Sequence, residues 1–329
     1  MRAITYRRYG SPDVLGIGEV PTPNVRPGDV LVRVRAASVN ALDWHMVRGK
    51  PYVARFEMGL RQPKSSIPGV DVAGIVEAVG TEVTELKPGD EVFANKGKAC
   101  AEYVCGPARL FVAKPANVTM EQAAAVPAAG ITALMAIRDH GKVQAGTSVL
   151  IHGAGGGVGT FTVQIAKAFG AKVTAVTRTE NVDLARSLGA DDVIDYTRED
   201  FTRLGRHWDV IIDNGATRSL MAMRRVLAKD GRMVLVGASK GDVVGTLARG
   251  FIGGPLLSAF REQSIITFYA SPKRDDLLVL KEMIEAGTIT PVVDRVYPLA
   301  ETADAMRYLE TMQARGKIVI TVAGSPGAR

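Results

Sequence analysis

Cysteine is scarce in this chain, which has only Cys100 and Cys105 among its 329 residues. Two cysteines cannot form the disulfide framework that stabilises many small secreted proteins, and they suit a reducing compartment. The chain also lacks any run of about 18 consecutive apolar residues, the length that a membrane-spanning helix requires. The sequence therefore predicts a cytoplasmic protein without a transmembrane segment.

Side chains that bind metals are also few. The chain has four histidines, His45, His140, His152 and His207, and their spacing matches no metal-binding motif. A structural zinc site typically takes four cysteine or histidine ligands, and a catalytic site takes three. These residues do not supply the ligand set or the spacing of either site, so we predict that the protein binds no metal.

The excess of basic residues is modest. The chain has 41 Lys and Arg against 34 Asp and Glu, a formal net charge of +7, and no run of basic residues exceeds two. A basic balance attracts phosphorylated ligands, anionic membrane surfaces or nucleic acid. Because the two signs of charge alternate along most segments, we expect a basic enzyme or a positively charged cofactor site, and no dedicated nucleic-acid partner.

The chain changes character near residue 121. Before it, short β-prone runs are separated by turns such as Pro27-Gly28-Asp29 and Pro88-Gly89-Asp90, which indicates an antiparallel module. After it, strand-like and helix-like segments alternate, which indicates a parallel sheet built from right-handed βαβ units. The predicted strands are 148–152, 172–177, 192–195, 209–213 and 232–237, and the predicted helices are 158–169, 182–188, 220–227, 277–286 and 302–314. The fold class is therefore α/β, with a doubly wound parallel sheet joined to a mainly antiparallel β domain.

A glycine-rich turn is the most informative segment. The apolar run 149–152 leads into Ala154-Gly155-Gly156-Gly157-Val158-Gly159, after which an amphipathic helix is predicted. The pattern matches the dinucleotide-binding fingerprint with alanine at its first position, so we predict that Ala154, Gly156, Gly157, Val158 and Gly159 hold a diphosphate at the start of the helix. His152 lies just before the turn, and we predict a structural role for it.

The end of the second predicted strand indicates which nicotinamide cofactor binds. An enzyme that uses NAD has an acidic residue there, which binds the ribose 2′-hydroxyl. This chain has Thr177 and Arg178, and no carboxylate until Glu180. A guanidinium and a hydroxyl suit the 2′-phosphate of NADPH, so we predict NADPH as the cofactor.

Together, several motifs resemble the medium-chain dehydrogenase/reductase superfamily, and within it the zinc-independent quinone oxidoreductase branch that includes zeta-crystallin. The motifs are 36–43 (AASVNALD), 68–74 (PGVDVAG), 126–133 (VPAAGITA), 154–159 (AGGGVG) and 188–196 (LGADDVIDY). The resemblance implies a GroES-like catalytic domain formed by residues 1–121 and 292–329. It also implies an inserted Rossmann domain formed by residues 122–291, with the cofactor in the cleft between the domains.

The resemblance also implies further cofactor contacts. Thr132 is expected near the nicotinamide and its phosphate, and Tyr196 near the 2′-phosphate beside Arg178. The remaining expected contacts are Asn214 and Gly215 on the adenosine side, Gly237 and the strand Phe268-Tyr269-Ala270 around the nicotinamide, and Lys317 on the pyrophosphate.

The resemblance bears on zinc as well. Zinc-dependent relatives have a cysteine where this chain has Asn40, and a His-Glu pair where it has Val70 and Asp71. Without a Lewis acid, reduction of a simple ketone is difficult, because the developing alkoxide needs strong stabilisation. A quinone or an α,β-unsaturated carbonyl is an easier acceptor, since its negative charge is delocalised and hydrogen-bond donors can stabilise it.

Candidate donors lie between residues 40 and 52. We predict that Asn40 directs its amide at the nicotinamide or the substrate, that His45 is a second donor, and that Tyr52 donates a proton. Asp43 is expected to anchor the local backbone. Residues 53–64 and 243–260 could cover a hydrophobic acceptor or could simply pack.

The predicted function is zinc-independent, NADPH-dependent transfer of hydride to a quinone or an enone. Two other functions remain open: an enoyl reductase for one biosynthetic intermediate, and a low-turnover NADPH-binding stress or RNA-binding protein. Residues 264–270 form a β-prone apolar segment at the expected edge of the sheet, where relatives pair with a second copy. We therefore predict a homodimer.

Overall fold

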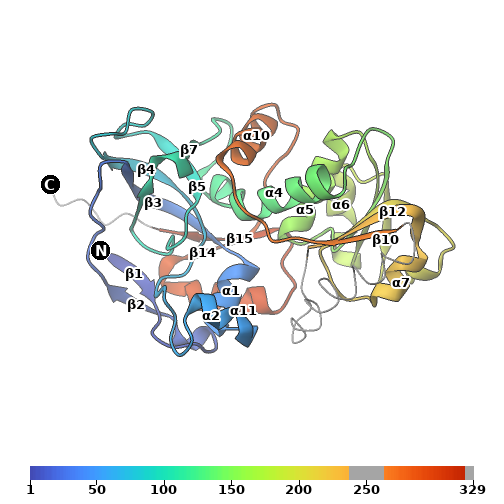
Figure 1. Cartoon of the computed structure of the whole chain (residues 1–329), viewed down its shortest axis with the longest axis horizontal. Coiled ribbons are helices and arrows are strands. Elements are labelled where there is room, and N and C mark those ends of the chain that lie inside the picture. The colour runs from blue at the N-terminus through green and yellow to red at the C-terminus, as the bar shows by residue number, and fades with distance from the viewer. Residues whose placement is uncertain (237–262, 323–329) are drawn as a thin grey trace. The chain divides into compact units, whose positions relative to one another are not determined.

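The computed structural model describes residues 1–236 and 263–322, and it divides the chain into two compact units (Figure 1). The first unit comprises Met1–Ala129, Pro272–Gly287 and Pro291–Arg329, and the second comprises Gly130–Ser271 and Thr288–Thr290. Residues 122–129 and 272–287 thus cluster with the first unit, whereas the boundaries expected from the sequence lie at 121/122 and 291/292. No helix of the described residues is long and apolar enough to span a bilayer.

The first unit contains a seven-stranded sheet in the order β14-β15-β3-β4-β5-β7, in which β6 also pairs with β3. All these pairs are antiparallel except β14 with β15. The strands are β3 (Asp29–Val39), β4 (Asp71–Val79), β5 (Glu91–Asn95), β6 (Tyr103–Pro107), β7 (Val112–Ala113), β14 (Val293–Pro298) and β15 (Lys317–Thr321), beside a small hairpin of β1 (Arg2–Thr5) and β2 (Gly16–Glu19). Its helices are α1 (Ala41–Arg48), α2 (Arg55–Met58), α3 (Met120–Ala124), α10 (Arg274–Glu285) and α11 (Thr302–Glu310), together with the 3₁₀ turn η2 (Tyr52–Ala54).

The Pro-Gly-Asp turns explain where β3 and β5 begin. Asp29 N–H donates to Arg26 O at 3.0 Å, and Asp90 N–H donates to Lys87 O at 3.1 Å, so each turn is closed by its own backbone. Gly89 has a φ of +96°, a conformation that glycine adopts without strain. The antiparallel module predicted for the N-terminal part of the chain is confirmed.

The described residues of the second unit form a six-stranded parallel sheet in the order β10-β9-β8-β11-β12-β13. With the strands numbered from β8, this is the 3-2-1-4-5-6 order of a Rossmann sheet, so the predicted doubly wound α/β domain is confirmed. The strands are β8 (Ser148–His152), β9 (Lys172–Thr177), β10 (Asp192–Asp195), β11 (Trp208–Asp213), β12 (Leu227–Leu235) and β13 (Ser264–Thr267). The helices in the described part of this unit are α4 (Pro127–Leu134), which begins in the first unit, the π-helical turn Met135–His140, α5 (Gly157–Ala168), α6 (Val182–Ser187) and α7 (Leu220–Arg225).

Two predicted strands differ from the structure by more than one residue at an end. β12 begins at Leu227, five residues before the predicted start. Leu227 was predicted at the end of the preceding helix, but it pairs with Trp208 of β11. The edge strand β13 ends at Thr267, so the prediction of a strand through Phe268-Tyr269-Ala270 is wrong. At the edge, β13 pairs only through Ser264–Thr267 with β12, and the next residues leave the ladder.

Candidate active site

The glycine-rich turn connects β8 to α5 in the second unit. Gly153 has a φ of +77°, and its N–H donates to Val176 O of β9 at 3.1 Å. A Cβ on Gly159 would lie 2.1 Å from Gly153 O, so the helix can approach the turn this closely only with glycine there. Gly156 is the N-cap of α5, and the first-turn amides and the positive end of this 12-residue helix suit a diphosphate.

The ends of the neighbouring strands β9 and β10 bring Arg178 and Tyr196 close together. Tyr196 N–H donates to Thr177 O at 3.0 Å, and Thr177 itself is buried. The Arg178 side chain is 21% exposed, and its Nε lies 3.5 Å from a carboxylate oxygen of Glu180, whereas Tyr196 is 42% exposed. A guanidinium and a phenol at adjacent strand ends can bind a phosphate monoester.

Asn214 follows β11 at the same edge of the sheet. Both polar atoms of its amide are buried, and neither has a hydrogen-bond partner among the described residues. Buried polar atoms that lack a partner are rare in native proteins, because each costs about 1–3 kcal/mol. A bound nucleotide offers hydroxyl and ring-nitrogen partners for such an amide, so the residues at this edge fit a dinucleotide.

His152 holds the loop beyond β11. Its Nδ1 lies 2.7 Å from an oxygen of Asp213, and its Nε2 lies 3.1 Å from Thr217 Oγ1. The same Asp213 oxygen accepts the N–H groups of Gly215 at 3.1 Å and Ala216 at 2.8 Å. His152 is 2% exposed, and both ring nitrogens are engaged, which agrees with the predicted structural role.

The other predicted cofactor residues of this unit lie in different places. Thr132 is half-buried on α4. Phe268 stacks on His140 with ring centroids 4.3 Å apart, Tyr269 is 77% exposed, and Ala270 is half-buried beyond the end of β13. Gly237 and the segment 243–260 lie outside the described residues. The contacts of all these residues with a cofactor remain predictions.

The first unit contains a buried carboxylate that four hydrogen-bond donors surround. Oδ2 of Asp71 on β4 accepts from Ser38 Oγ at 2.9 Å and from Asn40 Nδ2 at 3.0 Å. Oδ1 accepts from Asn95 Nδ2 and from Ala128 N, both at 2.9 Å. Asp71 is fully buried, so the strands of this sheet place one negative charge in the interior with its lone pairs occupied.

Lys317 places a positive charge beside this carboxylate. Its Nζ lies 3.8 Å from Asp71 Oδ2 and donates a hydrogen bond to Asn40 Oδ1, and the residue is 4% exposed. Burial lowers the pKa of Lys317, and the charges of Asp71 and Asp43 oppose that effect. Asn40 is thus held at both ends of its amide, by Lys317 and by Asp71. In this structure the ammonium that was expected on a pyrophosphate contacts Asn40 and Asp71.

A zinc ion does not fit the residues at this position. The resemblance implies that Asn40 and Asp71 stand where zinc-dependent relatives have ligands, but here the Asp71 lone pairs are already used and Lys317 already supplies a cation. Among residues 1–236 and 263–322, no group of three or more His, Cys, Asp or Glu side chains could hold a metal ion. We therefore derive no step that uses zinc.

Asp43 anchors the backbone around Asn40, as predicted. Its Oδ2 accepts from Asn40 N at 2.9 Å, and its Oδ1 accepts from Gly69 N at 2.8 Å. Asp43 is fully buried, and burial, with a further contribution from the charge of Asp71, raises its pKa to about 7. The two backbone hydrogen bonds and Lys317 act in the opposite direction.

The raised pKa of Asp43 predicts a pH-dependent stability. The unfolded chain loses this proton near pH 3.8, whereas the folded chain keeps it until about pH 7. The contribution of the protonated Asp43 carboxyl to the free energy of unfolding is therefore complete below pH 3.8 and declines as the pH rises to about 7. In Asp43→Asn the decline across this window should be reduced, although the variant loses an acceptor and is less stable at low pH. Chemical denaturation at a series of pH values measures the free energy of unfolding. Asp183→Asn is the control, because that carboxylate is exposed. If the free energy of unfolding of Asp43→Asn fell with pH as steeply as that of the unchanged protein, the prediction would be contradicted.

The other two predicted catalytic residues lie near Asn40 in the sequence but make separate contacts. His45 Nδ1 lies 2.9 Å from Lys50 O, so this nitrogen carries the proton, and burial lowers the pKa of the ring. In the neutral ring Nε2 then accepts a hydrogen bond, and the predicted donor role requires the protonated form. Tyr52 is 66% exposed on η2, and its ring lies 4.8 Å from the Arg55 guanidinium carbon.

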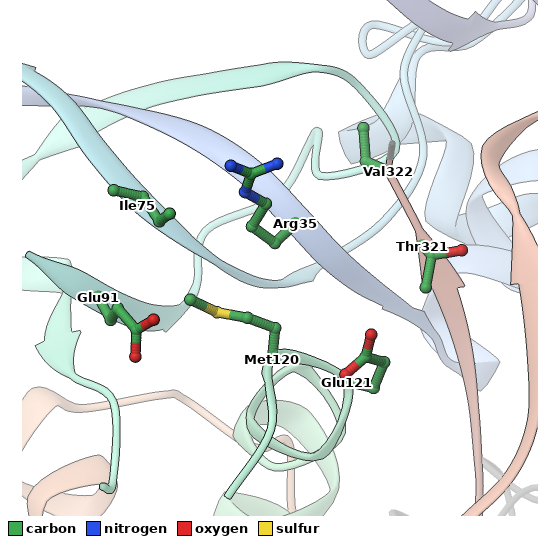
Figure 2. Close-up of a pocket in the computed structure, with 7 residues that line it drawn as sticks. All are labelled: Arg35, Ile75, Glu91, Met120, Glu121, Thr321 and Val322. Atoms are coloured by element: carbon green, nitrogen blue, oxygen red, sulfur yellow. The ribbon is translucent and has the colours of Figure 1, made fainter. Parts of the chain in front are cut away.

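A pocket of about 400 Å³ lies on the sheet of the first unit (Figure 2). It is lined by Arg35, Ile75, Glu91, Met120, Glu121, Thr321 and Val322. Because strand side chains alternate, Ile75 is on the same face as Asp71, and Thr321 on the same face as Lys317. In Figure 2 the Arg35 guanidinium points away from the carboxylates of Glu91 and Glu121, so the charged groups do not converge on one point. The pocket contains none of the predicted site residues, and we assign it no part in the reaction.

Comparison with known proteins identifies the family. The family described as "Alcohol dehydrogenase GroES-like domain" matches residues 26–139, and the one described as "Zinc-binding dehydrogenase" matches residues 188–320. An Arabidopsis thaliana protein named "NADPH-dependent alkenal/one oxidoreductase, chloroplastic" is 35% identical over 97% of this chain and 79% of its own length. The chain belongs to the medium-chain dehydrogenase/reductase superfamily.

Two other members of the superfamily are similar over nearly their whole length. The "Quinone-oxidoreductase QR1, chloroplastic" of Triphysaria versicolor is 31% identical over 97% of this chain and 98% of its own. The solved structure of the quinone oxidoreductase from Coxiella burnetii superposes with a TM-score of 0.85 at 28% identity, covering 98% of this chain and 99% of that one. The resemblance predicted from the motifs is confirmed, and so is the enzyme class of oxidoreductase.

The group around Asp71 was not predicted from the sequence. Ser38, Asp71 and Asn95 come from three different strands, and the resemblance implied for Asp71 only the position of a zinc ligand that this chain lacks. One signal was available: a single carboxylate in the apolar run Val70-Asp71-Val72 must be paired if that strand is buried. The partners themselves depend on the register between strands.

Proposed function

We propose that this protein is an NADPH-dependent, zinc-independent oxidoreductase that transfers hydride to a quinone or an α,β-unsaturated carbonyl. The observation that carries the proposal is the Asn40 amide, held between the Lys317 ammonium and the Asp71 carboxylate at the position of a zinc ligand in zinc-dependent relatives. The names of the Arabidopsis and Triphysaria relatives, an alkenal/one oxidoreductase and a quinone oxidoreductase, support this class of acceptor.

The second unit would hold the cofactor. The glycine turn and the first turn of α5 suit its diphosphate. The amide of Asn214, which has no partner within residues 1–236 and 263–322, suits its nucleoside. Arg178 and Tyr196 supply a cation and a phenol for a 2′-phosphate, which favours NADPH over NADH. When bound, the cofactor supplies the hydride.

The first unit would stabilise the charge that develops on the substrate oxygen. One N–H of the Asn40 amide donates to Asp71, whereas Nδ2 lies 3.4 Å from Ser38 O and from Ser38 Oγ, which is long for a hydrogen bond. The second N–H is therefore weakly engaged and can donate to an enolate or phenolate oxygen. The Lys317 ammonium on Oδ1 polarises the amide and makes that N–H a better donor.

Protonation of the product needs a separate group. We propose that Tyr52 does this from its exposed position on η2, because its hydroxyl is accessible to solvent and to a substrate. His45, with its proton on Nδ1, can accept a proton or a hydrogen bond at Nε2. Neither residue requires a metal to act.

Turnover measurements test the proposal. The purified protein should oxidise NADPH with quinones and enones, and much more slowly with saturated ketones. Asn40→Ala should lower kcat by about 10²-fold, the cost of removing one oxyanion donor. Asn117→Ala is the matched control in the same unit, since its amide donates to Ile284 O at 2.7 Å. Reduction of saturated ketones alone, or activity that depends on zinc near one equivalent per chain, would refute the proposal.

We also propose a homodimer, for which the edge of the Rossmann sheet is the support. Among the described residues β13 is the terminal strand of that sheet, and an edge strand can pair with a second copy. Light scattering at micromolar concentration should give twice the mass of the chain, and a monomer would contradict the proposal.

We propose the cytoplasm as the compartment of this protein. Imaging of a fluorescent fusion should find the protein there.

A further inference from the structure

Three large apolar side chains stand exposed on one short segment of the first unit. Tyr52 is 66% exposed, Phe56 is 75% exposed and Leu60 is 60% exposed. They lie on η2, on α2 and just beyond α2, four residues apart. Isolated exposed apolar residues are normal, but several in one short segment usually mark a contact surface.

Basic residues are frequent in this segment and in residues 7–9. Arg7, Arg8, Lys50, Arg61 and Lys64 are all exposed, and Arg55 is half-buried between the aromatic rings. Residues 7–9 and 50–64 contain six basic residues and one acidic residue, Glu57, a net charge of +5 against +7 for the whole chain. Most of the excess positive charge of the protein is therefore in these two segments.

The two segments contact each other through Tyr9. Tyr6 N–H donates to Ser66 O at 2.9 Å, and Tyr9 OH donates to Gly59 O at 2.6 Å. The Arg55 guanidinium carbon lies 4.4 Å from the ring centre of Tyr9 and 4.8 Å from that of Tyr52, and its Nε donates to Gly49 O at 2.9 Å. We name the surface formed by Arg7, Arg8, Lys50, Tyr52, Arg55, Phe56, Leu60, Arg61 and Lys64 the basic-apolar patch.

We propose that the basic-apolar patch docks the protein on the surface of an anionic lipid bilayer. Basic side chains are attracted by the negative surface potential of such a bilayer, and aromatic and aliphatic side chains bury themselves at the boundary between headgroups and acyl chains. The combination of both kinds of side chain favours lipid over nucleic acid, because an aliphatic side chain such as Leu60 offers no stacking surface for a base. The proposal does not depend on the proposed reaction.

Vesicle co-sedimentation tests the docking. The full-length protein should sediment with vesicles of phosphatidylcholine and phosphatidylglycerol in equal parts, and much less with phosphatidylcholine alone. The binding should weaken as salt is added, because surface charges are screened. Equal binding to both kinds of vesicle, or no binding to either, would overturn the proposal. So would salt-sensitive binding of single-stranded RNA without binding to vesicles, since the patch would then serve nucleic acid.

Paired variants locate the binding on the patch. Arg61→Glu/Lys64→Glu should weaken vesicle binding by about 30-fold or more, and Phe56→Ser/Leu60→Ser by about tenfold. The charge control is Arg186→Glu/Arg203→Glu, which changes the net charge equally at exposed arginines of the second unit. The apolar control is Met221→Ser/Val296→Ser, whose residues are 57% and 50% exposed. Equal losses in a patch variant and its control would refute the assignment to this surface, and an unchanged melting temperature shows that each variant is folded.

Discussion

Replacing Arg178 with alanine should weaken NADPH binding by about ten- to a hundredfold and leave NADH binding almost unchanged. The expected loss is that of a hydrogen bond to a charged group, about 1.5–3 kcal/mol. Arg178 follows β9, where the fingerprint of NAD enzymes has a carboxylate, and Tyr196 lies beside it at the end of β10. NADH has no 2′-phosphate, so it loses no partner when the guanidinium is removed.

Arg178→Asp should weaken NADPH binding further and make the protein bind NADH more tightly than NADPH. A carboxylate repels the 2′-phosphate of NADPH and can accept a hydrogen bond from the ribose hydroxyl of NADH. Dissociation constants of both cofactors with both variants, measured by fluorescence titration, give the result without any turnover. Arg186→Ala is the matched control, because that arginine is exposed on α6. Equal weakening of NADH and NADPH in Arg178→Ala would show that the arginine holds the turn and does not bind the phosphate.

The second unit was predictable because its signals are local. An apolar strand, a glycine cluster and an amphipathic helix follow one another between residues 148 and 168, and each is encoded by its own residues. The glycine positions are dictated by contacts within the same turn, such as Gly159 against Gly153. A local pattern of this kind can be predicted without knowledge of the contacts in the rest of the fold.

The cluster of polar residues around Asp71 in the first unit was not predictable in the same way. Its members come from β3, β4, β5, β15, the start of α1 and α4, and the sequence separation between Asn40 and Lys317 is 277 residues. Such contacts depend on strand order and register, which periodicity does not give. The resemblance assigned Lys317 to a pyrophosphate, whereas here its buried ammonium hydrogen-bonds to Asn40 beside Asp71. The predicted end of β13 was wrong for a similar reason. The strand ends at Thr267, and the apolar residue Phe268 that follows stacks on His140.

Replacing Lys317 with methionine should lower the free energy of unfolding by about 3–5 kcal/mol, the cost of leaving a buried charge without its partner. Asp71 is fully buried, and Lys317 is the cation 3.8 Å from it. The loss of Lys317 also removes a positive charge that lowers the pKa of Asp43, so that pKa should rise further. Denaturant-induced unfolding measures the change in free energy. Lys281→Met is the matched control: its exposed pair with Glu285, one helical turn away, contributes only about 0.3–0.5 kcal/mol.

A double-mutant cycle separates the charge from the packing of the side chain. Asp71→Asn leaves Lys317 without a counter-charge and should also destabilise the fold, because an amide group turns an N–H toward donors that need an acceptor. In Lys317→Met/Asp71→Asn both charges are absent, so the double variant should be more stable than the sum of the two single losses predicts. Strict additivity would mean that the two groups do not interact. Lys317 would then stabilise this region through its hydrogen bond to Asn40 and the packing of its aliphatic chain, and not through the charge of Asp71.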